Sequence, residues 1–229
     1  MIKSNISQIK EKIALICAKI KRDPATITLV AVSKNRTLEQ IKEAIGDSIS
    51  DIGENKVQEA LIKYNAIRNT QYAQRIKWHL VGHLQTNKAK DAVEIFDLIH
   101  SVDSLRLAQE IDKQAAKINK VQEILIEVKT SPEEAKSGLQ PEEAIGVIKE
   151  ISVLKNIRIL GVMTIAPLVD DPEKARPYFR ILAELKEKIN ALGATQNPIQ
   201  VLSMGMTNDF EIALEEGSNM LRIGRAIFE

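Results

Sequence analysis

Lys34 stands two residues after the end of the apolar run of residues 27–32, whose β-branched composition is typical of a strand buried on both faces. Partial desolvation at the mouth of a core makes a lysine amine a candidate nucleophile toward a carbonyl group. Taken alone, such a lysine more often only marks where a strand meets solvent. The far end of the chain changes this balance, because residues 202–209 and 221–226 have the composition of a phosphate site.

Hydroxyls, glycines and an arginine are concentrated in those two segments. Ser203 and Thr207 supply hydroxyls, Gly205 permits a close approach of the backbone, and free N–H groups at the start of the following helix attract anions. Gly224 and Arg225 add a second bare backbone and a guanidinium. An amine opposite a phosphate cradle indicates a phosphorylated carbonyl compound, so both a Schiff-base aldolase and a pyridoxal 5′-phosphate (PLP) protein remain open.

Each residue of this cradle also has an ordinary interpretation. Gly205 could be a plain turn, Met204 and Met206 could fill the core, and Arg222 could be a surface charge. The prediction of a site rests on their combination at positions where one fold would bring them together.

Strand-like runs alternate with helical patterns along the whole chain. Strands are predicted at residues 27–33, 49–53, 77–82, 97–101, 124–130, 158–165, 199–203 and 220–224. Helices are predicted near residues 37–45, 54–68, 86–95, 104–119, 141–153, 172–191 and 207–216. Thr37 with Gln40, Ser104, and Asp171 before Pro172 are the expected helix starts. An additional N-terminal helix carries isoleucines at every third or fourth position from Ile2 to Ile20.

This alternation predicts an α/β fold, a (β/α)8 TIM barrel with an extra N-terminal helix, in which residues 1–229 form a single domain. In such a barrel the loops that follow the strands meet at one face, and the loops after strands 7 and 8 often bind phosphate. Lys34 and the two cradle segments would therefore be neighbours.

Composition narrows the classes of function. The 32 basic and 31 acidic residues nearly balance, and only 3% of residues are aromatic, so neither a nucleic-acid partner nor a membrane surface is expected. The single cysteine, Cys17, cannot form an internal disulfide and is expected to be a buried core thiol. No signal peptide or membrane-spanning run is apparent, so a cytoplasmic protein is expected.

Six motifs resemble those of the pyridoxal phosphate homeostasis protein family, single-domain relatives of the alanine racemase N-terminal barrel. They occupy residues 30–34, 53–59, 78–88, 161–167, 202–206 and 222–224 and occur in the family's order over nearly the whole chain. The resemblance implies that Lys34 carries PLP as a Schiff base, that Ser203 and the glycine-containing loops hold the phosphate, and that Arg222 faces the pyridine nitrogen. The implied cofactor-binding residues are Lys34, Asn55, His79, Met163, Ser203, Met204, Gly205, Met206, Arg222, Gly224 and Arg225.

Other chemical residues receive ordinary interpretations. His79 and His83 are four residues apart, but a strand and a turn would point them differently, so no metal site is predicted. His100 is expected to be a packed histidine. Residues 131–138 are expected to form a solvated polar loop, with a lid as the less favoured alternative. Solvated helix charges are expected at Lys56, Lys63, Lys88 and Lys90.

The resemblance favours a carrier over an enzyme. An arginine opposite the pyridine nitrogen keeps that nitrogen unprotonated and weakens the ring as an electron sink. A two-base racemase also needs a second acid or base, which in the alanine racemases is a tyrosine from a C-terminal domain, and Tyr64, Tyr72 and Tyr178 fall in or beside helices. We therefore expect a protein without catalytic residues that buffers or delivers PLP, with PLP-dependent apo-enzymes as candidate recipients. A weak fold-type III racemase is the alternative, and a monomer is expected.

Overall fold

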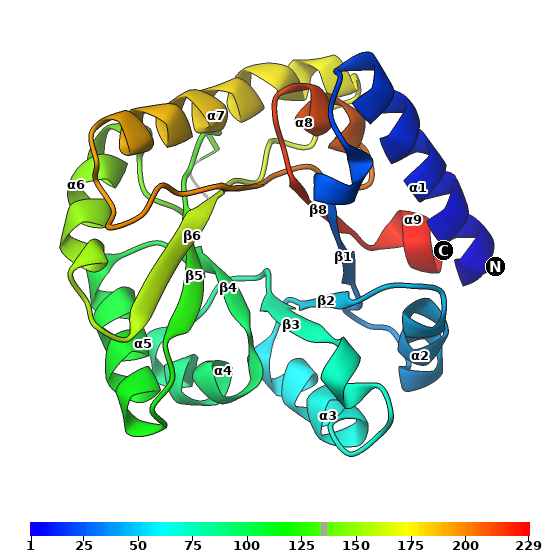
Figure 1. Ribbon diagram of the computed structural model, residues 1–229, viewed down its shortest axis with the longest axis horizontal. Coiled ribbons are helices and arrows are strands. Elements are labelled where there is room, and N and C mark those ends of the chain that lie inside the picture. The colour runs from blue at the N-terminus through cyan, green and yellow to red at the C-terminus, as the bar shows by residue number, and fades with distance from the viewer. Residues whose placement is uncertain (134–136) are drawn as a thin grey trace.

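Eight parallel strands close into a barrel in the computed structural model, which describes residues 1–133 and 137–229 (Figure 1). Each strand pairs with the next in the chain, and β8 pairs with β1. The strands are β1 (Thr28–Val32), β2 (Asp51–Glu54), β3 (Lys77–Leu80), β4 (Leu98–Val102), β5 (Gln122–Glu127), β6 (Ile157–Met163), β7 (Val201–Ser203) and β8 (Met220–Ile223). This closed order of eight parallel strands confirms the predicted TIM barrel.

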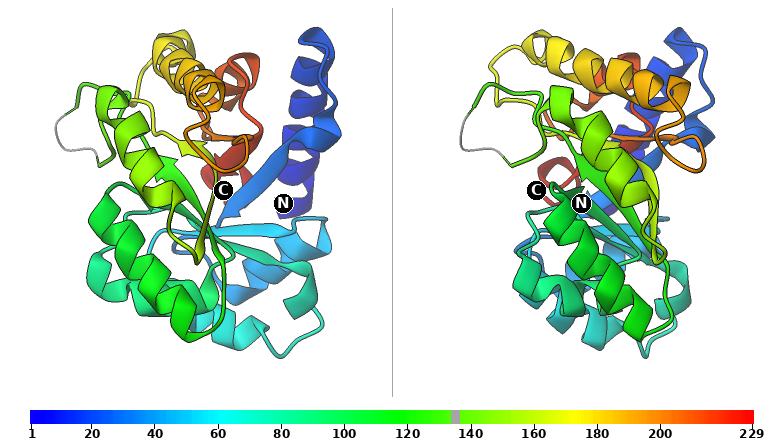
Figure 2. Two further views of the ribbon diagram at one scale, coloured as in Figure 1. Left: turned by 60° about the vertical axis from the view of Figure 1, so that its left-hand side comes forward. Right: turned by 90° about the vertical axis from the view of Figure 1, so that its left-hand side faces the viewer.

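Helices surround the barrel and connect its strands (Figure 2). They are α1 (Ile2–Lys19), α2 (Leu38–Gly46), α3 (Val57–Ile67), α4 (Ala89–Ile95), α5 (Leu105–Lys117), α6 (Pro141–Ser152), α7 (Arg176–Ala191), α8 (Phe210–Glu215) and α9 (Arg225–Phe228). The predicted capping box is present: the Thr37 hydroxyl accepts from the Gln40 N–H, and the Gln40 side chain accepts from the Thr37 N–H. Ser104 caps α5 through the Leu107 N–H, as expected.

Two predicted helix starts are wrong. Asp171 caps a short 3-10 turn, η4 (Pro172–Ala175), and α7 itself begins at Arg176. The helix expected from residue 207 begins only at Phe210, because residues 207–209 form turns closed by bonds from the N–H groups of Asp209 and Phe210 to the Met206 carbonyl. Helix α9 was not predicted, because four residues are too short to show a helical period.

The N-terminal helix α1 packs its isoleucine stripe against α2, α8 and α9 outside the barrel (Figure 1). The buried residues of the stripe are Ile2, Ile6, Ile9, Ile13 and Ile16. Cys17 is fully buried beside them, as expected, and burial raises the pKa of its thiol. Both ends of the chain lie close together on this side of the molecule (Figures 1 and 2).

Apolar residues form two separate cores. The larger fills the space between the strands and the helices. A smaller cluster lies among inward-pointing residues of the barrel, namely Val30, Val81, Leu98, Leu125, Met163 and Met220. Because side chains alternate along a strand, the residues two positions after Leu98, Leu125 and Met220 also point inward. These residues are polar, namely His100, Glu127 and Arg222.

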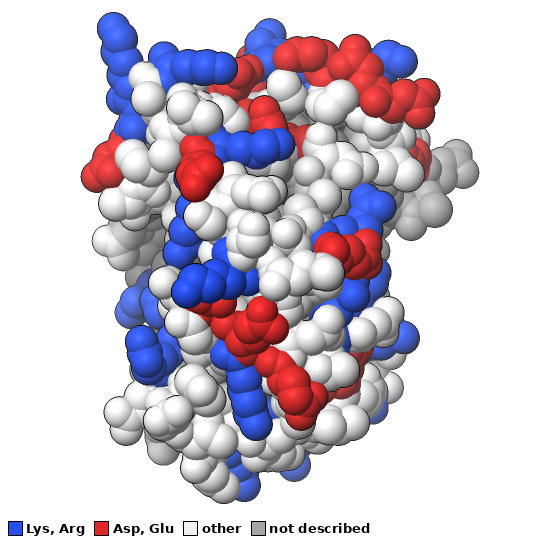
Figure 3. Space-filling view, turned by 90° about the vertical axis from the view of Figure 1, so that its right-hand side faces the viewer, with Lys and Arg blue, Asp and Glu red and all other residues white. Residues whose placement is uncertain are grey.

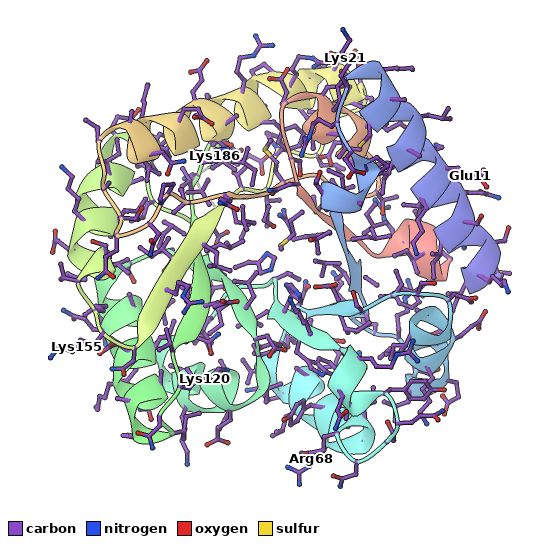
Figure 4. All side chains as sticks on the ribbon, in the orientation of Figure 1. Glu11, Lys21, Arg68, Lys120, Lys155 and Lys186 are labelled. Atoms are coloured by element: carbon purple, nitrogen blue, oxygen red, sulfur yellow. The ribbon has the colours of Figure 1, made fainter. Side chains whose placement is uncertain are left out.

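Charges of both signs are interspersed on the face that carries α1, as the near balance of the composition suggests (Figure 3). Figure 4 shows Glu11, Lys21 and Arg68 pointing outward at the rim of the molecule, and all three are exposed. Within residues 1–133 and 137–229, no helix is long and apolar enough to cross a membrane.

One of the four lysines predicted to be solvated is buried. Lys63 has 7% of its side chain exposed and is paired with Glu54 and Glu59, so that prediction is wrong. Lys56 and Lys90 are exposed and Lys88 is half-buried. Part of the polar loop predicted over residues 131–138, namely residues 134–136, lies outside the described residues.

Candidate functional site

A pocket of about 540 Å³ lies beside the loops that follow the strands, the end of the barrel where the sequence places a site. Loops after β1, β2, β6, β7 and β8 contribute to its wall. Six of the predicted site residues line it: Lys34, Asn55, Met206, Arg222, Gly224 and Arg225. Thr207 lines it as well. The topology therefore brings the lysine and much of the proposed phosphate cradle into one cavity.

Lys34 lies in a turn two residues beyond the end of β1. Val30 belongs to the barrel-interior cluster and Val32 packs against it, so the alternation of the strand carries Lys34 toward the same side. Lys34 is exposed, whereas the sequence suggested a partly desolvated position. The residues on either side of Lys34 are held by hydrogen bonds from their N–H groups, Ser33 to the Gly53 carbonyl and Asn35 to Glu59. The Lys34 side chain borders the pocket.

The loops after β7 and β8 are joined to each other at the pocket wall. The Ala226 N–H donates to the Thr207 hydroxyl at 3.4 Å, and the Arg225 guanidinium donates to the Asn208 side chain at 3.4 Å. The Met206 N–H donates to the Asp209 carboxylate at 2.6 Å, so this N–H has a partner within the loop. The wall consequently presents backbone, a hydroxyl and a guanidinium on two connected loops.

Gly205 is required for the packing of this loop. Its φ of +95° lies in the left-handed region, and an added Cβ would come within 2.6 Å of the Ala213 Cβ on α8. Gly205 is not part of the pocket wall. The close backbone approach expected of this glycine is thus made to α8.

Arg222 is a buried cation at the floor of the pocket. Only 4% of the residue is exposed, and its guanidinium donates to the Ser203 hydroxyl at 2.7 Å and to the Thr164 carbonyl at 2.8 Å. Burial lowers the pKa of Arg222 to about 10, although Asp209 and Glu127 oppose the shift. The guanidinium is still protonated at neutral pH, so the pocket keeps a fixed positive charge.

A continuous chain of hydrogen bonds runs from Arg222 through the interior of the barrel. Ser203 Oγ lies 3.0 Å from His100 Nδ1, His100 Nε2 lies 2.9 Å from His79 Nδ1, and His79 Nε2 lies 2.9 Å from the Asp51 carboxylate. These residues come from β8, β7, β4, β3 and β2, and the chain ends at Asp51, the first residue of β2. His100 is fully buried, as predicted for a packed histidine, and its burial lowers its pKa well below the usual value.

The two ends of this chain fix the direction of every hydrogen bond. Arg222 can only donate and the Asp51 carboxylate can only accept, so with one N–H on each imidazole His79 donates to Asp51 and His100 donates to His79. The Ser203 hydroxyl then donates to His100 and accepts from Arg222. Both hydrogen-bonding functions of Ser203 are engaged beneath the pocket, and the chain orients Arg222.

The remaining predicted residues lie close to the pocket but not on its wall. His79 and Ser203 belong to the chain beneath it, and Met163 lies in the barrel-interior cluster. The Met204 side chain is buried in the outer core. His83 is half exposed and lies 3.6 Å from Asp103, so the two histidines of the 79–83 pair point to different surroundings.

Sequence reasoning missed part of the wall and one buried acid. The wall includes the apolar loop after β6, at Ile165, Ala166, Pro167 and Leu168, which overlaps a motif but carries no chemical group that would draw attention. Glu127 points into the barrel from the end of β5 with 7% of the residue exposed. Its place two residues after the interior Leu125 is the signal that could have found it.

Glu127 should make stability depend on pH. Burial raises its pKa to about 7, Asp103 adds to the shift, and Arg222 opposes it. The folded state therefore holds the proton to a higher pH than the unfolded state, and stability falls as the pH rises from about 4.5 through 7. Glu127→Gln should remove this loss, gaining about 3 kcal/mol relative to the unchanged protein between about pH 4 and pH 8. Urea unfolding of both proteins at pH 4 and at pH 8 measures the difference in their free energies of unfolding. The same difference at the two pH values would contradict the prediction.

Comparison with known proteins identifies the family. The family model for the alanine racemase N-terminal domain matches residues 1–229. A protein of Aquifex aeolicus named pyridoxal phosphate homeostasis protein is 40% identical over 223 residues, covering 97% of this chain and 95% of the relative. The chain belongs to the pyridoxal phosphate homeostasis protein family. This confirms the resemblance inferred from the six motifs.

Solved structures similar to this homeostasis-family chain agree over its full length. A protein of Bifidobacterium adolescentis has a TM-score of 0.93 at 34% identity, covering 99% of this chain and 94% of its own. PipY of Synechococcus elongatus, solved with PLP bound, has a TM-score of 0.84 at 31% identity, covering 100% of both chains. The barrel fold is therefore shared with a homologue that was solved with PLP bound.

Proposed function

We propose that this protein binds PLP in the pocket at the carboxyl ends of the strands and maintains PLP homeostasis by buffering or delivering the cofactor. The observation that carries the proposal is the convergence of Lys34, Arg222 and the joined loops 206–209 and 224–226 on one cavity. The names of the relatives and the PLP-bound PipY structure support it.

The residues of the pocket fit the three parts of the cofactor. An exposed amine on Lys34 suits the aldehyde, and apolar walls at Val32, Val81 and Ile165 suit a flat ring. Thr207, Gly224 and Arg225 suit a phosphate, in place of the larger set first predicted. A Cβ at Gly224 would lie 3.1 Å from the Val32 carbonyl, so even a small side chain there would be crowded against β1. Ser203 and His79 act from beneath, through their hold on Arg222.

The proposed binding mode favours a carrier over an efficient enzyme. When bound, PLP supplies an electron sink, which works best with a protonated pyridine nitrogen. Arg222 keeps its own proton at neutral pH and donates hydrogen bonds, so a nitrogen facing it would stay unprotonated. The described wall residues include no tyrosine, the residue type that serves as the second acid or base in the alanine racemases, and their acidic side chains are those of Glu133, Asp209 and Glu229.

We therefore expect no racemisation at ordinary enzyme rates. The protein should bind one equivalent of PLP per chain, measured by a visible absorbance titration. Once loaded with PLP, it should leave L-alanine and other amino acids unchanged in a chiral assay. Turnover of about 1 per second or more for any amino acid would contradict the carrier assignment. Failure to bind PLP at all would contradict the proposed function itself.

A further inference from the structure

The turn that carries Lys34 rests on a buried cluster of charged residues. The cluster consists of Lys63 and Glu59 on α3 and Glu54 at the end of β2. Lys63 has 7% of its side chain exposed, Glu54 has none, and Glu59 has 25%. None of the three belongs to the wall of the pocket.

The Lys63 ammonium uses all three of its donors within this cluster. It donates to Glu54 Oε1, Glu59 Oε1 and the Ser33 carbonyl, each at 2.7 Å. The Ser33 hydroxyl donates to the same Glu54 oxygen. The ammonium is therefore held by two carboxylates and by the backbone of the residue just before Lys34.

Glu59 holds the residue on the other side. The Asn35 N–H donates to Glu59 Oε1 at 2.7 Å, and that oxygen also accepts from Lys63. Asn35 has a φ of +59°, a left-handed conformation that is uncommon for residues other than glycine. A bond from the Arg36 N–H to the Ser33 carbonyl at 3.0 Å closes the turn. Both neighbours of Lys34 are thus tied to one ion pair, while the Lys34 side chain is left to the pocket.

Placing an ion pair out of contact with water is costly, so this cluster is a weak source of stability. What the cluster does fix is the geometry of the turn that carries Lys34. In addition, the residues it fixes are those that decide where the Lys34 amine lies relative to the pocket.

We propose that Lys63 and Glu59 are positioning residues that set the Lys34 amine for bond formation with the aldehyde of PLP, an inference that rests on the proposed function. The neutral amine adds to the aldehyde carbon, a carbon–nitrogen double bond forms, and the aldehyde oxygen leaves as water with the two hydrogens of the amine. No oxidant, reductant or further reactant is needed.

Two ligands separate positioning of the amine from general integrity of the pocket. PLP can bond to Lys34, whereas pyridoxine 5′-phosphate has an alcohol in place of the aldehyde and cannot. Lys63→Met should slow the appearance of the visible absorbance with PLP about tenfold or more, the effect of losing one hydrogen bond to a charged group. Its dissociation constant for pyridoxine 5′-phosphate, measured by fluorescence or calorimetry, should stay within about twofold of the unchanged protein, because Lys63 and its two carboxylate partners do not border the pocket.

The matched control is Lys56→Met, because Lys56 is an exposed lysine at the start of the same helix and should leave both measurements unchanged. Glu59→Ala is the second variant. Glu59 is partly exposed, and its replacement by alanine removes the acceptor of the Asn35 N–H. If Lys63→Met fails to fold, the rate of the absorbance change in Glu59→Ala tests the proposal.

Unchanged rates with PLP in Lys63→Met and Glu59→Ala would overturn the inference. So would an equal loss of affinity for PLP and for pyridoxine 5′-phosphate, because that result would mean general damage to the pocket. Covalent attachment that persists in Lys34→Ala would instead overturn the proposed role of Lys34, so the two failures are distinguishable.

Discussion

Pyridoxal, which lacks the phosphate, should bind at least about a hundredfold more weakly than PLP. The phosphate would meet the Thr207 hydroxyl and the Arg225 guanidinium on the two joined loops, close to the bare backbone of Gly224. Hydrogen bonds to charged groups contribute about 1.5–3 kcal/mol each, so losing two of them lowers affinity about a hundredfold or more. Equilibrium titration of the unchanged protein with each compound measures the ratio.

Gly224→Val provides the matched test on the protein side. The valine would crowd Val32, which lines the same wall as Gly224, so it should weaken PLP more than pyridoxal. The φ of −113° at Gly224 lies outside the left-handed region, and circular dichroism checks that the valine variant folds. Equal affinity of the unchanged protein for pyridoxal and PLP would show that these loops do not hold the phosphate.

Lys34→Ala should abolish the visible absorbance of bound PLP while leaving the barrel folded. Lys34 is exposed on a turn and no hydrophobic core depends on it, so truncation should cost little stability. The variant should still bind PLP noncovalently through the phosphate wall, with weakened retention during dialysis. A visible band of unchanged position and intensity in Lys34→Ala would contradict the assignment.

The control for this variant is Lys129→Ala. Lys129 also follows a strand, β5, but it does not belong to the pocket wall, and its N–H donates to the Leu139 carbonyl. The substitution should leave the absorbance of bound PLP unchanged.

The barrel could be predicted from sequence because its signals are local and repeated. Most strands are short runs rich in buried apolar residues, and the longer helices have their own apolar period, so the order of the strands and of the longer helices could be predicted. Element ends are less certain, since they depend on side chains such as Asp209, which binds the Met206 N–H and delays α8.

Buried charges could not be assigned from residue type alone. Lys63 shares the spacing of the buried Val57, Ala60 and Ile67 on α3, which was the available sign that it faces the barrel. A lysine at a buried position of such a stripe ordinarily pairs with a carboxylate or another acceptor. Its acceptors, Glu54 and the Ser33 carbonyl, come from other elements and are visible only in the fold.

The depth of each inward residue was also beyond the sequence. Arg222 and Ser203 both lie at strand ends, yet Arg222 borders the pocket and Ser203 is fully buried below it. The stagger of neighbouring strands decides this depth, and β7 meets β8 with Ser203 beside Met220 rather than beside Arg222. The motifs therefore selected residues of which six line one pocket, while the division of the set into wall and support needed the structure.

Borohydride reduction of the PLP-loaded protein, followed by peptide mass mapping, tests the central claim most directly. Reduction fixes the bond between PLP and the lysine that holds it, and the map then identifies that lysine. The structure predicts a single label on Lys34, which among the described lysines is the one that borders the pocket, beside Arg222 and Gly224. A label on Lys129, or on another lysine in place of Lys34, would contradict the account.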